Sequence, residues 1–130
     1  MRILIVDDEP LVRKSLGRAC RSKGHEVIEA VDGAEGLTKW LAEKPDLVFL
    51  DVLMPGLSGP ELLMEISRKL SLDLAPKADG KRSGRVILMS AYSGEHNVAT
   101  AQQMGADLFI PKPFDDVFAV VAKAEALFGG

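Results

Sequence analysis

The residues of this chain that could do chemistry are polar side chains placed after short apolar runs. The clearest is Asp51, which follows the apolar residues 48–50 and precedes Pro55-Gly56, where regular structure must end. Such a run is typical of a strand buried in a parallel sheet, and Asp51 would lie at its carboxyl end, where ligands bind in open α/β sheets. Because a buried carboxylate without a partner is costly, Asp51 is expected to be used chemically. The plainer alternative is that it only caps the next loop.

Other polar side chains follow the remaining apolar runs. Asp7 and Asp8 follow the first run, Ser90 follows the fourth, and Lys112 comes just after the fifth. Three carboxylates brought together repel one another unless a cation lies among them, and a hard divalent ion such as Mg²⁺ prefers oxygen ligands and shares phosphate oxygens. The lysine ammonium and the serine hydroxyl suit phosphate oxygens. The set predicts a phosphoryl-transfer site in which Asp51 is the nucleophile and forms an acyl phosphate.

Five strands and five helices are predicted to position these side chains. The apolar runs predict strands at 3–6, 25–31, 48–51, 86–89 and 108–110. Helical spacing and end signals predict helices at 10–23, 34–43, from Ser58 or Gly59 onward, at 94–104, and from a cap at Asp115 to about Leu127.

Details of these helices are also predicted. Gly24 is expected to be a left-handed cap, and Trp40 an aromatic at the edge of the core. The residues expected to face inward on the first helix are Leu11, Val12, Leu16, Ala19 and Cys20, and on the third helix Leu62, Leu63, Ile66 and Leu70.

Strands alternating with helices predict an α/β fold with a doubly wound parallel sheet covered on both faces. The flavodoxin-like (βα)5 arrangement with strand order 2-1-3-4-5 fits best. Its switch point lies between the first and third strands, which places Asp7 and Asp8 beside Asp51. Residues 74–84 contain Pro, Gly and small polar side chains and predict a long surface loop before the fourth strand.

Length and composition predict one domain over residues 1–130. The 16 basic and 19 acidic residues give a net charge of -3, which argues against direct nucleic-acid binding. A single cysteine, Cys20, excludes an internal disulfide, fits a reducing compartment, and is interpreted as an inert, partly buried thiol. Neither a signal peptide nor a membrane-length apolar run is recognised, so a soluble, cytoplasmic protein without membrane contact is expected.

Four motifs resemble the receiver domain of two-component response regulators, in particular the chemotaxis-regulator-like members. They are Val6-Asp7-Asp8-Glu9-Pro10, Leu50-Asp51-Val52-Leu53-Met54-Pro55-Gly56, Ser90-Ala91-Tyr92 and Lys112-Pro113-Phe114. The resemblance covers essentially the whole chain. It implies that Asp51 accepts a phosphoryl group from a phosphohistidine on a sensor histidine kinase or a histidine phosphotransfer protein.

The resemblance also assigns roles to individual residues. Mg²⁺ (or Mn²⁺) would be bound by Asp8, Asp51 and the backbone carbonyl of Leu53, with Asp7 acting through a water. Ser90 and Lys112 would hold the phosphoryl oxygens, and Ser90 and Phe109 would form the switch. The Lys112–Pro113 peptide bond would be cis, and a downstream protein target would bind the face formed by the fourth helix, fifth strand and fifth helix. The domain would be a phosphoacceptor switch, which catalyses only its own phosphorylation and dephosphorylation and is otherwise not an enzyme.

Three features set this chain apart within that resemblance. The long loop carries Lys77, Lys81 and Arg82, and is interpreted as a solvated insertion or, alternatively, as a partner-docking loop. Phe109 stands where many relatives have Tyr. Leu53 and Tyr92 border the expected path of the hydrolytic water and are predicted to tune the lifetime of the phosphorylated state, unless both lie flat on the surface.

Three other functions remain as alternatives. A haloacid-dehalogenase-type phosphohydrolase also uses an aspartate nucleophile with Mg²⁺, but it needs a second aspartate where Leu53 stands. A phosphate-independent pseudo-receiver usually lacks some of the acidic or basic residues that are present here. A flavodoxin-like cofactor binder is disfavoured because the acidic first loop would repel a flavin phosphate. The sequence also predicts no DNA-binding or catalytic output module within this chain.

Overall fold

The computed structural model describes residues 1–52, 59–70, 85–90, 107–112, 114 and 116–127. Within that part of the chain, none of the helices combines the length and the apolar character needed to cross a membrane. The side chains of α3 are described only in part, and those of Leu63 and Leu70 lie outside the description.

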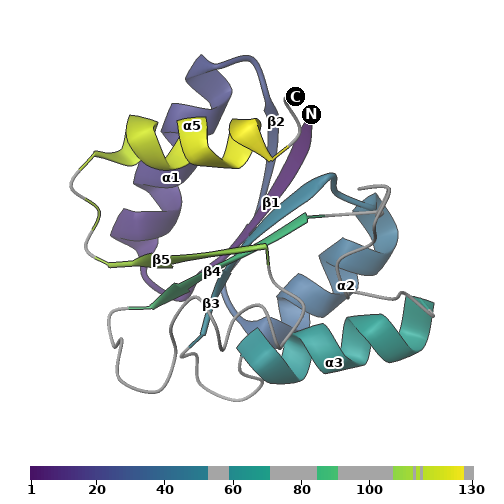
Figure 1. Cartoon of the computed structure of the whole chain (residues 1–130). Coiled ribbons are helices and arrows are strands. Elements are labelled where there is room, and N and C mark those ends of the chain that lie inside the picture. Colours follow the sequence, from purple (N-terminus) through teal and green to yellow (C-terminus); the bar gives the residue numbers. More distant parts are fainter. Residues whose placement is uncertain (53–58, 71–84, 91–106, 113, 115, 128–130) are drawn as a thin grey trace.

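A five-stranded parallel sheet forms the centre of the molecule, in the predicted order β2-β1-β3-β4-β5. The strands are β1 (Arg2–Val6), β2 (Glu26–Ala30), β3 (Leu47–Asp51), β4 (Arg85–Ser90) and β5 (Leu108–Pro111). The described helices are α1 (Pro10–Ser22), α2 (Gly33–Glu43), α3 (Gly59–Leu70) and α5 (Val117–Ala126). Figure 1 shows α1 and α5 on one face of the sheet and α2 and α3 on the other.

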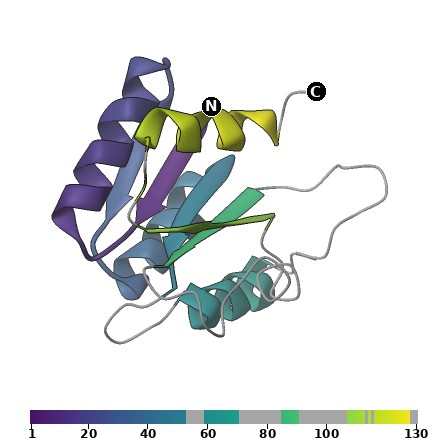
Figure 2. The ribbon, with the colours of Figure 1, turned by 60° about the vertical axis from the view of Figure 1, so that its left-hand side comes forward.

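Alternating side chains of the strands build two separate cores. Leu4 and Val6 of β1 point into the core beneath α2 and α3, whereas Ile3 and Ile5 point into the core beneath α1 and α5. Every residue of β3 is buried, as expected for the middle strand of a sheet covered on both faces. The view in Figure 2 shows the sheet lying between the two helical layers. The structure thus confirms the prediction of a doubly wound α/β fold.

Local end signals fix most of the helix boundaries. Pro10 occupies the first helical position of α1, where its missing N–H costs nothing, and Gly24 lies just past that helix with a φ of +86°. Asp32 caps α2 by accepting a hydrogen bond of 2.8 Å from the backbone N–H of Glu35. The positions of Pro10 and Gly24 agree with the sequence-based expectations, whereas the cap at Asp32 was not predicted.

Two expectations about α1 and α5 were wrong. Leu11 does not face inward but is 84% exposed, because it lies five residues before Leu16 and is therefore roughly 140° away around the helix. The cap of α5 is Asp116 rather than Asp115: its side chain accepts a hydrogen bond from the backbone N–H of Phe118. Adjacent aspartates are equally good caps, and only the path of the chain into the helix selects between them.

Smaller differences concern burial. Cys20 is fully buried rather than partly buried, and burial raises the pKa of its thiol to about 12, which is consistent with an inert side chain. Trp40 is buried within the core beneath α2 and α3 rather than at its edge. Leu62 and Ile66 face inward as predicted. The long loop at 74–84 and the fourth helix at 94–104 lie outside the described residues.

Candidate functional site

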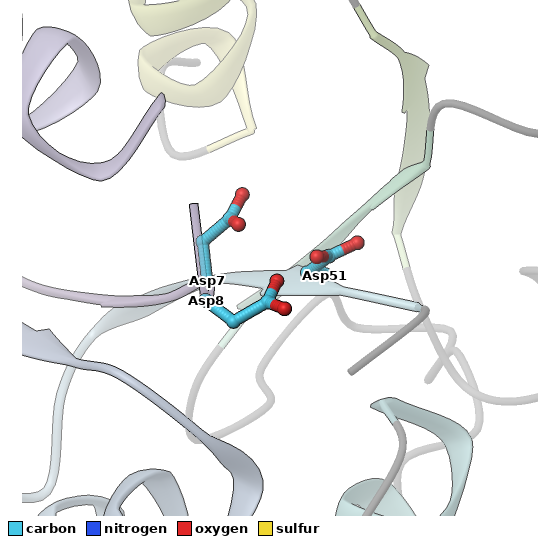
Figure 3. Close-up of side chains that lie close together, drawn as sticks. All are labelled: Asp7, Asp8 and Asp51. Carbon is cyan, nitrogen blue, oxygen red and sulfur yellow. The ribbon is translucent and has the colours of Figure 1, made fainter. Parts of the chain in front are cut away.

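Three carboxylates meet at the carboxyl ends of two neighbouring strands. Because β1 pairs with β3, Asp7 and Asp8, which follow β1, lie beside Asp51, the last residue of β3. Each of the three side chains offers an oxygen, and these oxygens all lie within 4.8 Å of one another. Figure 3 shows the three side chains projecting into the same space. Asp7 and Asp51 are buried, whereas Asp8 is on the exposed side of the cluster.

The donor set of this cluster fits a hard divalent cation. Carboxylate oxygens are the ligands that Mg²⁺ prefers, and Mg²⁺ needs only one or two protein carboxylates because it keeps several waters. The exposed position of Asp8 leaves the cluster open to solvent on one side. Leu53, whose carbonyl was predicted as a further ligand, lies outside the described residues.

Lys112 brings a positive charge into the acidic cluster. It follows β5, and its backbone N–H donates a hydrogen bond of 2.8 Å to the carbonyl of Ser90 at the end of β4. Its Nζ lies 3.1 Å from Asp7 Oδ2, 2.6 Å from Glu9 Oε1 and 3.5 Å from Asp51 Oδ2. Burial lowers the pKa of Lys112, but the surrounding carboxylates, led by Glu9, outweigh burial and raise it overall. The ammonium therefore stays charged.

Asp7 is the most enclosed carboxylate of the cluster. Burial raises its pKa above the ordinary value, while the backbone N–H of Glu9 and the Lys112 ammonium limit the rise. The Glu9 N–H donates to Asp7 Oδ1 at 2.9 Å. A carboxylate held in this way gains from any additional positive charge that enters the site.

Ser90 and Phe109 lie where the sequence predicted them. Ser90 is the buried last residue of β4, next to β5 in the register that pairs it with Pro111. Phe109 is half-buried and packs against the core beneath α2 and α3. Tyr92 and Pro113 lie outside the described residues, so the predictions for their positions and for the cis peptide bond are untested.

Sequence reasoning assigned no role to two residues of this region, Glu9 and Arg13. Glu9 entered only as part of the motif Val6-Asp7-Asp8-Glu9-Pro10, yet it makes the shortest of the three carboxylate contacts to Lys112. Arg13 is buried, and its guanidinium donates to the carbonyl of Asp7 at 2.8 Å and pairs with Glu29 at 3.2 Å. A signal for Arg13 exists in the sequence, since it shares the helical spacing i, i+3, i+7 with Leu16 and Cys20.

The arrangement is suited to reactions at an anionic centre. Asp51 offers a carboxylate oxygen for attack, while the Lys112 ammonium and a metal bound by the acidic cluster would neutralise negative charge beside it. A phosphoryl group carries such charge on its oxygens, and its transfer depends mainly on positioning and electrostatic stabilisation.

Comparison with known proteins identifies this architecture. The family model of the response regulator receiver domain matches residues 3–122. This chain belongs to that family. Receiver domains act in two-component signalling and bind Mg²⁺ through an acidic cluster, for which Asp7, Asp8 and Asp51 are the corresponding group here.

Curated relatives of this receiver domain include proteins of different lengths. It is 37% identical to the chemotaxis protein CheY of Treponema pallidum over 88% of this chain and 74% of that protein. It is 35% identical to the transcriptional activator protein PfeR of Pseudomonas aeruginosa over 87% of this chain, but that match spans only 33% of PfeR. The match to the transcriptional regulatory protein PdtaR of Mycobacterium tuberculosis is 34% identical over 87% of this chain and spans 50% of that protein. The receiver domain thus corresponds to half or less of several relatives.

Solved structures agree with the fold. The response regulator TrrA from Thermotoga maritima, in complex with Mg²⁺-BeF, is 34% identical, with 97% of each chain covered and a TM-score of 0.75. The CheX-CheY-BeF3-Mg complex from Borrelia burgdorferi contains a chain that is 30% identical, with 100% of this chain and 90% of that chain covered and a TM-score of 0.82.

Proposed function

We propose that this receiver domain accepts a phosphoryl group on Asp51 from a phosphohistidine, in a reaction that depends on a divalent cation. The observation that carries the proposal is the position of Asp51, with its carboxylate 3.5 Å from the buried Lys112 ammonium and within 4.8 Å of two further aspartates. The donor would be a sensor histidine kinase or a histidine phosphotransfer protein.

Each step of this reaction has a group in the chain that serves it. An Asp51 oxygen attacks the phosphorus, the bond between phosphorus and the imidazole nitrogen breaks, and its electron pair stays with the imidazole, which takes up a proton. The product is an aspartyl phosphate. Lys112 and the Ser90 hydroxyl would hold the phosphoryl oxygens, and Lys112 already lies within 3.5 Å of Asp51. When bound, Mg²⁺ (or Mn²⁺) supplies further neutralisation of phosphoryl charge.

The metal would be held by Asp8, Asp51 and the Leu53 carbonyl, with Asp7 acting through a water. Asp8 is the exposed member of the acidic cluster, which suits a ligand that meets an ion arriving from solvent. Asp7 is committed to Lys112 and to the Glu9 backbone, which suits an indirect role.

The consequence of phosphorylation would be a change in a protein-binding surface. We assign that surface to β5, α5 and the fourth helix predicted at 94–104, and the trigger to Ser90 and Phe109. On this proposal the domain, residues 1–130, is a switch rather than an enzyme acting on other molecules, and it binds no nucleic acid directly. A cytoplasmic location is part of the proposal and is supported by the free thiol of Cys20.

The proposal is tested by incubating the protein with Mg²⁺ and a small phosphodonor such as phosphoramidate and measuring intact mass. We expect one phosphoryl adduct on the wild type and none on Asp51→Asn. Asp46→Asn is the matched control. Asp46 is an exposed aspartate just before β3, at the end of that strand opposite to Asp51. A stable adduct on Asp51→Asn would refute the assignment of Asp51.

A further inference from the structure

Among the described residues, Lys112 has three carboxylate neighbours, and Glu9 is the nearest of them. Its Nζ lies 2.6 Å from Glu9, compared with 3.1 Å from Asp7 and 3.5 Å from Asp51. A lysine ammonium has three N–H donors, so three carboxylates are enough to engage all of them. A phosphoryl oxygen that is to bind Lys112 must therefore compete with a carboxylate.

Glu9 is the neighbour that can be released at the lowest cost. Asp7 and Asp51 are buried, with side-chain exposures of 0% and 4%, and a charged group without a partner is costly there. The Glu9 side chain is 55% exposed and can exchange the ammonium for water. The competition is therefore between the incoming phosphoryl group and Glu9.

The backbone directs the Glu9 carboxylate towards Lys112. Glu9 is the N-cap residue of α1, but its side chain makes no cap hydrogen bond. Its backbone N–H donates to Asp7 Oδ1, which fixes the start of the side chain beside the acidic cluster. The contact with Lys112 joins residues 103 positions apart in the sequence.

We propose that Glu9 is a positioning residue that occupies Lys112 in the resting state and must release it before the lysine can bind a phosphoryl group. This inference rests on the proposed function of Asp51. Glu9 lowers the affinity of the site for a phosphoryl group in this way, while Asp7 and Asp51 keep Lys112 within reach.

The test measures the affinity for beryllofluoride, a stable phosphoryl mimic, by ¹⁹F NMR at saturating Mg²⁺. Two variants separate the effect of the contact between Glu9 and Lys112 from the effect of the negative charge on Glu9. Glu9→Gln removes the charge, and Glu9→Asp keeps the charge but shortens the side chain by one methylene so that it no longer reaches Lys112. The control is Glu43→Gln, which removes a carboxylate of similar exposure, 48%, that lies near Arg2.

We expect both Glu9 variants to bind beryllofluoride about fivefold more tightly than the wild type, in line with the loss of one competing ion pair whose carboxylate is half exposed. Glu43→Gln should bind like the wild type. If Glu9→Asp binds beryllofluoride with wild-type affinity, the negative charge at position 9 alone would set the affinity, without contact to Lys112. That result would overturn the inference. If the wild type itself binds no beryllofluoride, the proposed function of the site fails, and the inference fails with it.

A second measurement needs no metal. In metal-free protein, Glu9→Gln should lower the melting temperature more, or raise it less, in the wild-type background than in a Lys112→Met background. The reason is that Glu9 loses an attractive partner only when Lys112 is present. Equal shifts in the two backgrounds would show that the pair does not interact in solution and would overturn the inference.

Discussion

Asp7 and Asp8 are adjacent in sequence and yet have opposite environments. Asp7 is buried against Lys112 and the Glu9 backbone, whereas Asp8 is exposed on the open side of the acidic cluster. Desolvation raises the free energy of the ionised Asp7 side chain, whereas Asp8 remains in contact with solvent. At the residue scale, one carboxylate is therefore suited to hold the site together and the other to receive an ion.

This difference predicts the effect of Asp8→Ala on metal binding. At a Mg²⁺ concentration 100-fold above its dissociation constant, the wild type should gain about 2.7 kcal/mol of stability. A tenfold loss of affinity in Asp8→Ala would remove about 1.4 kcal/mol of that gain. We also expect the metal-free variant to be at least as stable as the metal-free wild type, because one repulsive charge is gone.

The measurement is thermal unfolding with and without Mg²⁺, with Glu43→Ala as the control for loss of an exposed acid. Equal responses to Mg²⁺ in Asp8→Ala and the wild type would argue against Asp8 as a ligand.

At the scale of elements, a cluster of charges ties α1 to β2. Glu29 of β2 lies within 3.3 Å of three cations of α1, namely Arg13, Lys14 and Arg21. Arg13 in turn holds the carbonyl of Asp7. The cluster therefore connects helix packing to the position of the acidic loop.

Glu29→Gln should destabilise the protein by about 1.5–3 kcal/mol, because the buried Arg13 loses a charged partner. Burial raises the pKa of Glu29, but hydrogen bonds from Arg21 and Lys14 outweigh burial and lower it overall. A lowered pKa in the folded state contributes stability above the ordinary value of 4.5, and this stability is lost as the pH falls below it.

The wild type should therefore lose more stability than Glu29→Gln on acidification from about pH 4.5 downward, as measured by denaturant unfolding. Glu26→Gln is the matched control in the same strand, since its side chain is 63% exposed and its solvent-screened pair with Arg2 should contribute little to stability. Parallel pH profiles for Glu29→Gln and the wild type would contradict the pairing.

Close packing of α2 on β1 depends on Gly36. A Cβ at this position would lie 2.9 Å from Val6 Cγ1 and 3.3 Å from Leu62 Cδ2. Gly36→Ala should therefore cost about 1–3 kcal/mol through overpacking, as measured by denaturant unfolding. Gly17→Ala in α1 is the control: its Cβ would lie no closer than 3.4 Å to any neighbour, so the higher helix propensity of alanine should make it neutral or stabilising. A neutral Gly36→Ala would contradict the packing.

At the scale of the whole molecule, the site exists only when the sheet is complete. Its groups come from the ends of β1, β3, β4 and β5, so they span residues 7 to 112. We predict that the lifetime of the phosphorylated state is controlled at the same edge of the sheet, by Leu53 and Tyr92, which follow β3 and β4 in the sequence.

The last prediction concerns the lifetime of phosphorylated Asp51, which we expect to be long. Neither Leu53 nor Tyr92 offers an amide or carboxylate to orient the attacking water, and Tyr92 is bulky enough to crowd its approach. The double variant Leu53→Asn, Tyr92→Glu should lose phosphate distinctly faster in Mg²⁺ after the donor is removed. Indistinguishable decay would show that these positions do not gate the water.

The sequence by itself determined the order of the described elements, the strand order and the residues at the strand ends. These features are carried by local patterns: apolar runs of strand length, helical spacing, and signals such as Pro10 and Gly24. Parallel strands then bring their carboxyl ends to one edge, which is why the sequence alone places Asp7, Asp8 and Asp51 together.

Only the tertiary structure decided how those residues pair. The pairing of Arg13 with Glu29 and the contact between Glu9 and Lys112 depend on how helices lie against the sheet. No local pattern encodes a distance between side chains 103 positions apart, because that distance is set by the packing of several elements at once. The partners of Lys112 are therefore set by the folded molecule. The position of Lys112 after the fifth strand, by contrast, could be predicted from the sequence.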